Sequence, residues 1–263
     1  MTPTIDVGGL EALTFDFGNT LMVDPEPDET KSARLDDLAS WLRERGVAIP
    51  RARIEAAFAS AETAQNRATE AATHFGAAAA IDHILDDLGV TADRHAKALL
   101  CRRFEDPRPE RPLEPVDGVA EALADLQGAG IRLGIVSNLG YRPARVMRRN
   151  LQHASLAKFF EPAAVVFSDE VGMRKPNANI FQIALDALGT SPVHAAHIGD
   201  SKTYDVSPAR DAGMKAIRFR GVHDDDGDGA EADLVLSSFD ELRRLDWRSK
   251  SGPRRGATRP SRR

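Results

Sequence analysis

Apolar residues in this chain follow two different spacings, and the change from one to the other divides the sequence. From residue 25 to 105 they recur every three or four positions, as Leu35, Leu38 and Leu42 do beside Trp41. This spacing is typical of amphipathic helices. It predicts helices over residues 33–45, 51–73, 75–88 and 92–104, followed by a linker at the four prolines between residues 107 and 115.

The remaining sequence alternates short, continuous apolar runs with helical stretches. A strand whose residues are nearly all apolar is expected where both faces of a sheet are covered. The pattern predicts strands over residues 12–17, 131–137, 165–168, 195–199, 215–219 and 234–236, and helices over 119–127, 142–152, 180–188 and 206–212. Such alternation predicts an α/β fold with a doubly wound parallel sheet. The sheet domain would comprise residues 1–24 and 106–247, and residues 25–105 would form an all-helical insertion.

The composition narrows the class of protein and its compartment. The 263 residues suffice for one large or two modest domains, and the hydrophobic content of 42% is ordinary for a globular protein. No apolar run reaches about 18 residues, so we expect no membrane span, and residues 1–11 lack the pattern of a secretory signal. The single Cys101 fits a reducing compartment. These features predict a cytoplasmic protein, and they leave open whether it forms a homo-oligomer.

Charge is distributed unevenly along the chain. Residues 248–263 include seven basic residues and no acidic one. Without these seven, the rest of the chain has 28 basic and 40 acidic residues, a net charge of −12. An acidic body does not indicate specific nucleic-acid binding. The basic tail, rich in Ser, Gly and Pro, is predicted to be disordered; it could touch RNA, an acidic partner or a lipid head group, although a solvated terminus is the favoured interpretation.

The first predicted strand ends in a carboxylate and a tight turn. Asp16 follows Leu13-Thr14-Phe15, at the end of a strand where open α/β sheets bind their ligands. A carboxylate can attack phosphorus and form an aspartyl-phosphate, but an Asp in this place can also simply cap the next turn. Gly18 and Asn19 permit a close turn whose backbone N–H groups face a phosphate, and Thr20 adds a hydroxyl.

Two further segments carry polar groups that suit the same chemistry. Ser137 and Asn138 close a buried strand, where a hydroxyl can bind a phosphoryl oxygen. Lys175 precedes Pro176, which disfavours helical geometry for the lysine. A lysine held in this way can offset negative charge on a nucleophile and on a transferred phosphoryl group. Each segment alone is weak, since Ser-Asn pairs and lysines are common in ordinary loops.

Two acidic residues follow the strand predicted over 195–199. Asp200 ends this strand and Asp205 comes five residues later. Hard oxygen ligands placed close together suit Mg²⁺, which also accepts waters and substrate oxygens. With Asp16 at a neighbouring strand end, such an ion could bridge a nucleophile and a phosphate.

In this order, the four segments resemble the signature motifs of the haloacid dehalogenase-like (HAD) hydrolases, over about residues 12–245. The stretches 167–172 and 179–181 are similar to the phosphatase branch of that family. The resemblance implies a Rossmann-like core, a helical cap formed by residues 25–105, Mg²⁺ as cofactor and a small phosphorylated metabolite as substrate. It also implies roles for individual residues: Asp16 as nucleophile, Lys175 as charge stabiliser, Thr20 and Ser137 as phosphate contacts, Asn138 as an orienting residue, and Asp16, Asp200, Asp205 and the carbonyl of Gly18 at the metal.

Gly18 departs from the pattern that this resemblance implies. Phosphatases of the family have a second Asp there, which protonates the leaving oxygen and later activates water. A residue from the cap could replace it, the substrate could have a good leaving group such as an acyl or anomeric phosphate, or the chain could be weakly active or inactive. The leading prediction is a Mg²⁺-dependent phosphatase. The alternatives are a non-catalytic protein that binds a phosphometabolite or a partner, and a 2-haloacid dehalogenase, which lacks the second Asp and needs no metal.

Several other patterns suggest sites but favour simpler interpretations. Residues 224–229 partly match a calcium loop, but Val235 stands where a bidentate Glu is required. Gly128-Ala129-Gly130 precedes a strand, so it is no dinucleotide fingerprint. His197 lies in an apolar strand and is interpreted as a satisfied core residue. His74 and His83 fall in the helical insertion, where the sequence does not place them relative to a site.

Overall fold

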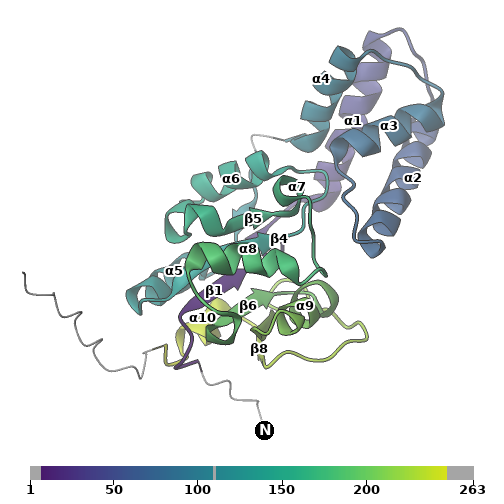
Figure 1. Ribbon diagram of the computed structural model, residues 1–263. Coiled ribbons are helices and arrows are strands. Elements are labelled where there is room, and N and C mark those ends of the chain that lie inside the picture. The colour runs from purple at the N-terminus through teal and green to yellow at the C-terminus, as the bar shows by residue number, and fades with distance from the viewer. Residues whose placement is uncertain (1–6, 109–110, 248–263) are drawn as a thin grey trace, which may run out of the picture.

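The computed structural model describes residues 7–108 and 111–247 (Figure 1). The predicted tail, residues 248–263, lies outside the described residues. The centre is a six-stranded sheet in the order β5-β4-β1-β6-β7-β8, and every neighbouring pair is parallel. Its strands are β1 (Ala12–Phe15), β4 (Arg132–Ser137), β5 (Val165–Phe167), β6 (Ala195–Gly199), β7 (Lys215–Phe219) and β8 (Leu234–Leu236). The chain reverses its direction of travel across the sheet around β1, which is where such sheets bind ligands.

Helices cover both faces of this sheet. Leu13 and Phe15 of β1 join one apolar cluster with α5 (Val119–Gly128), α6 (Ala144–His153) and α10 (Phe239–Arg243). Ala12 of the same strand joins another with α8 (Asn179–Leu188) and α9 (Ser207–Asp211). Successive side chains of a strand point to opposite faces, so the continuous apolar runs reflect burial on both sides. The predicted α/β class with a doubly wound parallel sheet is confirmed.

The helical insertion has a core of its own. Helices α1 (Pro27–Glu44), α2 (Arg51–Glu70), α3 (Ala77–Leu88) and α4 (Arg94–Glu105) pack around a separate cluster that includes Trp41, Phe58 and Phe104. Figure 1 shows this α1–α4 unit grouped at one end of the molecule. Tyr141, from the loop after β4, reaches into it and stacks edge-on against Phe104 with ring centroids 5.0 Å apart. The segments before and after this insertion pair with each other as a short antiparallel ribbon of β2 (Met22–Val23) and β3 (Glu114–Pro115).

Most predicted elements are found, with shifted ends. The first helix begins at Pro27, because proline fits the first turn of a helix, where its missing N–H is not needed. The first strand ends at Phe15, and the helix predicted over 206–212 is a π-helical turn at Lys202–Val206 followed by α9. The two-residue strands β2 and β3 and the short helices α7 (Ser168–Val171) and α10 were not predicted, because elements of this length show no period. Over the described residues, no helix is long and apolar enough to cross a bilayer.

Candidate active site

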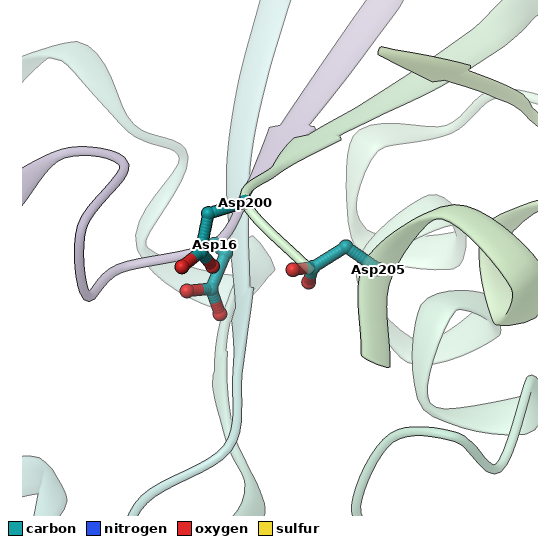
Figure 2. A group of neighbouring side chains, drawn as sticks. All are labelled: Asp16, Asp200 and Asp205. Atoms are coloured by element: carbon teal, nitrogen blue, oxygen red, sulfur yellow. The ribbon is translucent and has the colours of Figure 1, made fainter. Parts of the chain in front are cut away.

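Three carboxylates meet at the carboxyl ends of the central strands. Asp16 directly follows β1, Asp200 directly follows β6, and Asp205 lies in the π-helical turn. Figure 2 shows their side chains pointing toward one another. One oxygen from each lies within 4.8 Å of the others. Sequence reasoning expected this convergence from the shared edge of the sheet, and the structure brings the three residues together.

Gly199 makes the approach of Asp205 possible. A Cβ atom at position 199 would overlap the carboxyl carbon of Asp205 and would lie 2.6 Å from its Cβ. Only a residue without a side chain therefore leaves room for the turn to fold back against the end of β6. The carboxylate, 2% exposed, then accepts a 2.9 Å hydrogen bond from the backbone N–H of Ser201.

Lys175 sits between two of the carboxylates. Its Nζ atom donates to Asp16 Oδ1 at 2.6 Å and to Asp205 Oδ1, and its side chain is only 1% exposed. The side-chain amide of Asn138 accepts from the backbone N–H of Lys175 and donates to its carbonyl, both at 2.8 Å. Asn138 thus holds the lysine main chain from the neighbouring loop, which fits the orienting role expected for it.

The charges of this cluster perturb one another. Burial lowers the pKa of Lys175, but the carboxylates of Asp16 and Asp205 outweigh it and raise the pKa to about 12. Burial raises the pKa of Asp16, an effect that Lys175 opposes only in part. Burial also acts upward on Asp205, but Lys175 and His197 lower its pKa below the ordinary value. The ammonium group of Lys175 is therefore held in its charged form between the carboxyl groups of Asp16 and Asp205.

Asp200 forms no ion pair with a cationic side chain of the described residues. Burial, together with the charges of Asp16 and Asp205, raises its pKa to about 7. The side-chain amide of Asn19 donates a hydrogen bond to Asp200 Oδ2, with an Nδ2–Oδ2 distance of 3.3 Å. A divalent cation would supply the missing positive charge, and the donor set of carboxylate oxygens fits Mg²⁺. The residues present therefore fit a magnesium site.

The turn after Asp16 differs from expectation in one respect. Asn19 adopts the left-handed backbone conformation, with φ of 54°, whereas Gly18 does not. The backbone therefore does not require glycine at position 18, and a Cβ built there meets no atom within 4 Å. Gly18 borders a cavity of about 240 Å³ that Ser137 and Asn138 also line. Thr20 is fully buried and its hydroxyl makes no hydrogen bond to the described residues, so its predicted phosphate contact stays a prediction.

Residues 10–213 match the family model described as haloacid dehalogenase-like hydrolase. The chain belongs to this family. A glyceraldehyde 3-phosphate phosphatase of Methanothermobacter thermautotrophicus is 31% identical over 150 residues, which are 51% of this chain and 63% of the relative. A phosphoserine phosphatase of Thermus thermophilus is 34% identical over 160 residues, 60% of each protein. The chain thus spans less than two thirds of the length of either relative.

Solved structures place this HAD hydrolase in the same fold. A HAD phosphatase from Thermococcus onnurineus superposes with a TM-score of 0.63 at 22% identity, and a 2-haloacid dehalogenase from Pseudomonas syringae pv. tomato DC3000 with 0.64 at 21%. Both comparisons cover 89% of this chain and 96% of the other. Because a phosphatase and a dehalogenase resemble the chain equally well, this likeness establishes the fold and leaves the choice of reaction to the site.

Sequence reasoning missed some polar residues beside the site of this hydrolase. Arg142 and Asp24 line the same cavity as Gly18 and form an ion pair at 2.9 Å. His197, interpreted from the sequence as a core residue, is indeed buried, but it is bound to Asp205. The available signal was a histidine two residues before Gly199 in an otherwise apolar strand.

The other suggestive patterns have structural explanations. Asp224 pairs with Arg218, and Asp225 accepts from the backbone N–H of Lys202 at 2.7 Å. The carboxylates of Asp224 and Asp225 are therefore engaged by other residues, whereas a calcium loop would need them as ligands. His83 lies within the α1–α4 unit, 2.8 Å from the hydroxyl of Ser60. Half-buried Cys101 has a pKa raised by burial, which favours the unreactive thiol.

Proposed function

We propose that this hydrolase is a Mg²⁺-dependent phosphatase of a small phosphorylated metabolite, with an aspartyl-phosphate intermediate on Asp16. The observation that carries the proposal is the cluster at the end of β1, where Lys175 binds Asp16 at 2.6 Å beside Asp200 and Asp205. The two phosphatase relatives support the same reaction class. Metal-independent dehalogenation does not account for the second acidic pair, Asp200 and Asp205.

The residues divide the chemistry among them. A carboxylate oxygen of Asp16 attacks phosphorus, the bond to the leaving oxygen breaks, and water then hydrolyses the aspartyl-phosphate. Lys175 offsets the charge that accumulates on the attacking carboxylate and on the phosphoryl oxygens. The hydroxyl of Ser137, with that of Thr20, binds the phosphoryl group, and Asn138 keeps Lys175 in place.

The metal site would consist of Asp16, Asp200, Asp205 and the backbone carbonyl of Gly18. When bound, Mg²⁺ would neutralise the carboxylates and polarise the phosphoryl oxygens. A bound cation would offset the repulsion from Asp16 and Asp205 that, together with burial, raises the pKa of Asp200 to about 7. Asp205 supports the site mainly through its neighbours, since Lys175, His197 and Ser201 already donate to it.

Gly18 limits the substrates that this site can hydrolyse. Glycine offers no proton for the leaving oxygen, so the proposal favours substrates whose leaving group departs without one, such as acyl or anomeric phosphates.

Residues 25–105 would act as the cap that encloses the substrate, and the protein would work in the cytoplasm. Both statements rest on the sequence patterns and on the separate core of the α1–α4 unit.

The test is phosphate release from a panel of p-nitrophenyl phosphate, anomeric sugar phosphates and acetyl phosphate, with Mg²⁺ and with EDTA. Asp16→Asn removes the nucleophile, and Asp226→Asn, on an exposed loop, is the matched control. We expect Mg²⁺-dependent turnover that Asp16→Asn abolishes and Asp226→Asn leaves intact. Halide release from a 2-haloacid without metal would establish dehalogenation instead. Ligand-induced thermal stabilisation without turnover would establish a binding protein.

A further inference from the structure

A buried polar pair stands out in an apolar layer of the molecule. Thr14 of β1 and His197 of β6 are direct partners in the parallel register, and they are 0% and 1% exposed. The layer around them consists of Ala, Val, Ile, Leu, Met and Phe side chains from the strands and from α8 and α9. The ring of Phe181 packs edge-on against the imidazole with centroids 4.8 Å apart. Burying polar groups in such a layer is costly unless they are hydrogen-bonded.

The hydrogen bonds of this pair fix the state of the imidazole. His197 Nε2 lies 3.1 Å from Asp205 Oδ1, and His197 Nδ1 lies 2.9 Å from Thr14 Oγ1. An ionised carboxylate only accepts hydrogen bonds, so Nε2 carries the proton. Burial among apolar groups favours the neutral ring, and its Nδ1 then accepts the hydroxyl proton of Thr14. The threonine thereby holds the ring, through Nδ1, in the tautomer that donates to Asp205.

These contacts continue to the nucleophile. Asp205 Oδ1, which accepts from His197, also accepts from Lys175, and Lys175 donates to Asp16 at 2.6 Å. Asp16 lies two residues after Thr14, on the same side of β1. The hydrogen bonds therefore run from β1 through β6, the π-helical turn and Lys175, and they return to the end of β1. Each side chain in this series of hydrogen bonds is held by the preceding side chain.

We propose that Thr14 and His197 form a positioning relay that aims Asp205 at Lys175 and so keeps the lysine against Asp16. Both residues are buried within the sheet, so both act through other groups and not on the substrate. The catalytic meaning of the relay rests on the proposed phosphatase function. A pair that merely filled space would need the volume of these side chains but not their hydrogen bonds.

Single substitutions separate the hydrogen bonds from the volume. Thr14→Val keeps the shape and removes the hydroxyl, whereas Thr14→Ser keeps the hydroxyl. We expect Thr14→Val to lower kcat about 3- to 10-fold with KM unchanged, and Thr14→Ser to remain close to the parent, because a neutral buried hydrogen bond has about this energetic worth. His197→Phe should lower kcat about 10- to 100-fold, because Asp205 loses a donor.

A double mutant and a packing control complete the activity test. In the His197→Phe background, Thr14→Val should have no further effect on kcat, because no imidazole remains for the threonine hydroxyl to hold. Phe181→Leu loosens the packing beside the imidazole and leaves both hydrogen bonds in place, so it should lower Tm but not kcat. Independent, multiplicative effects of the two relay substitutions, or an equal loss of kcat in Phe181→Leu, would overturn the relay.

A spectroscopic measurement tests the relay without turnover. In protein labelled with ¹⁵N-histidine, the resonances of His197 are those lost in His197→Phe. Imidazole ¹⁵N shifts should show the Nε2–H tautomer in the parent and in Thr14→Val, and in Thr14→Val the Nδ1 resonance should move because this nitrogen loses its hydrogen bond. An Nδ1–H tautomer in the parent would overturn the relay whatever the activity. Failure of the parent to release phosphate from any substrate, with the expected tautomer present, would refute the phosphatase function and retain the arrangement of Thr14, His197 and Asp205.

Discussion

Replacing Gly18 by Asp should give the site the proton donor that it lacks. Gly18 does not adopt the left-handed conformation, and a Cβ there meets no atom within 4 Å. Aspartate therefore fits without backbone strain, because neither the backbone angles nor a neighbouring atom excludes a side chain at this position. Gly18 lines the same cavity as Ser137 and Asn138, so the new side chain would lie beside the proposed site of phosphoryl transfer.

The size of the effect depends on the leaving group. General acid–base catalysis typically contributes about 10²–10⁴-fold, so kcat/KM for alkyl phosphates, whose leaving oxygens need a proton, should rise by about that factor in Gly18→Asp. For acetyl phosphate and p-nitrophenyl phosphate the gain in the first step should be under about tenfold, because these groups leave without a proton. The assay is kcat/KM for a series of phosphate esters, plotted against the pKa of the leaving alcohol. The slope should be steep in the parent and shallow in Gly18→Asp.

Two controls make this prediction refutable. Gly18→Asn has the same shape but carries no transferable proton, so it should retain the steep slope of the parent. Gly18→Ala should be close to the parent in both rate and slope. An equal gain for all leaving groups, or a gain in Gly18→Asn as large as in Gly18→Asp, would show that position 18 acts through shape or metal binding and not through proton transfer.

Three further predictions concern the carboxylates. Below its pKa of about 7, Asp200 holds a proton that competes with Mg²⁺. The Mg²⁺ affinity, measured by calorimetry, should therefore fall about tenfold per pH unit below pH 7 and level off above it. A flat profile from pH 5 to 8 would contradict this. The raised pKa of Asp200 also means that its contribution to metal-free stability is complete below about pH 4 and is lost as pH rises through 7. Asp200→Asn should therefore raise Tm in EDTA at pH 8 but not at pH 4. Gly199→Ala should displace Asp205, which its Cβ would overlap, and should lower both Tm and kcat at a cost of about 1–3 kcal/mol. The control Gly128→Ala, where a Cβ meets nothing within 4 Å, should leave kcat unchanged and should not lower Tm.

The fold was predictable because its main elements are long or strongly patterned. Continuous apolar runs located the six strands of the sheet, and the 3.6-residue spacing located α1 to α4. The ribbon of β2 and β3 was not predictable, because two-residue strands have no period and their pairing joins segments about 90 residues apart. The order of the strands was also beyond the sequence patterns, which predict alternation but not the position of β1 between β4 and β6.

The candidate site was predictable as a set of residues but not as a set of contacts. A parallel sheet brings strand ends together, so Asp16 and Asp200 were expected to meet. The contact of His197 with Thr14 depends on the register of β6 against β1, and that register is invisible in one sequence. The pairing of Arg142 with Asp24 likewise depends on how the loop after β4 lies against the start of the α1–α4 unit.

The proposed site separates two contributions that phosphatases usually combine. Lys175, the acidic cluster and Ser137 supply charge stabilisation and binding, whereas Gly18 removes proton transfer. The loss bears on both steps of the proposed reaction, because the same group would protonate the leaving oxygen in the first step and activate water in the second. A substrate with a good leaving group escapes the first penalty but not the second, since every substrate gives the same aspartyl-phosphate on Asp16. For substrates with a good leaving group, hydrolysis of the aspartyl-phosphate should then limit turnover. For substrates with a poor leaving group, departure of that group should limit it. A series of leaving groups therefore reports on Gly18, whereas a single substrate does not.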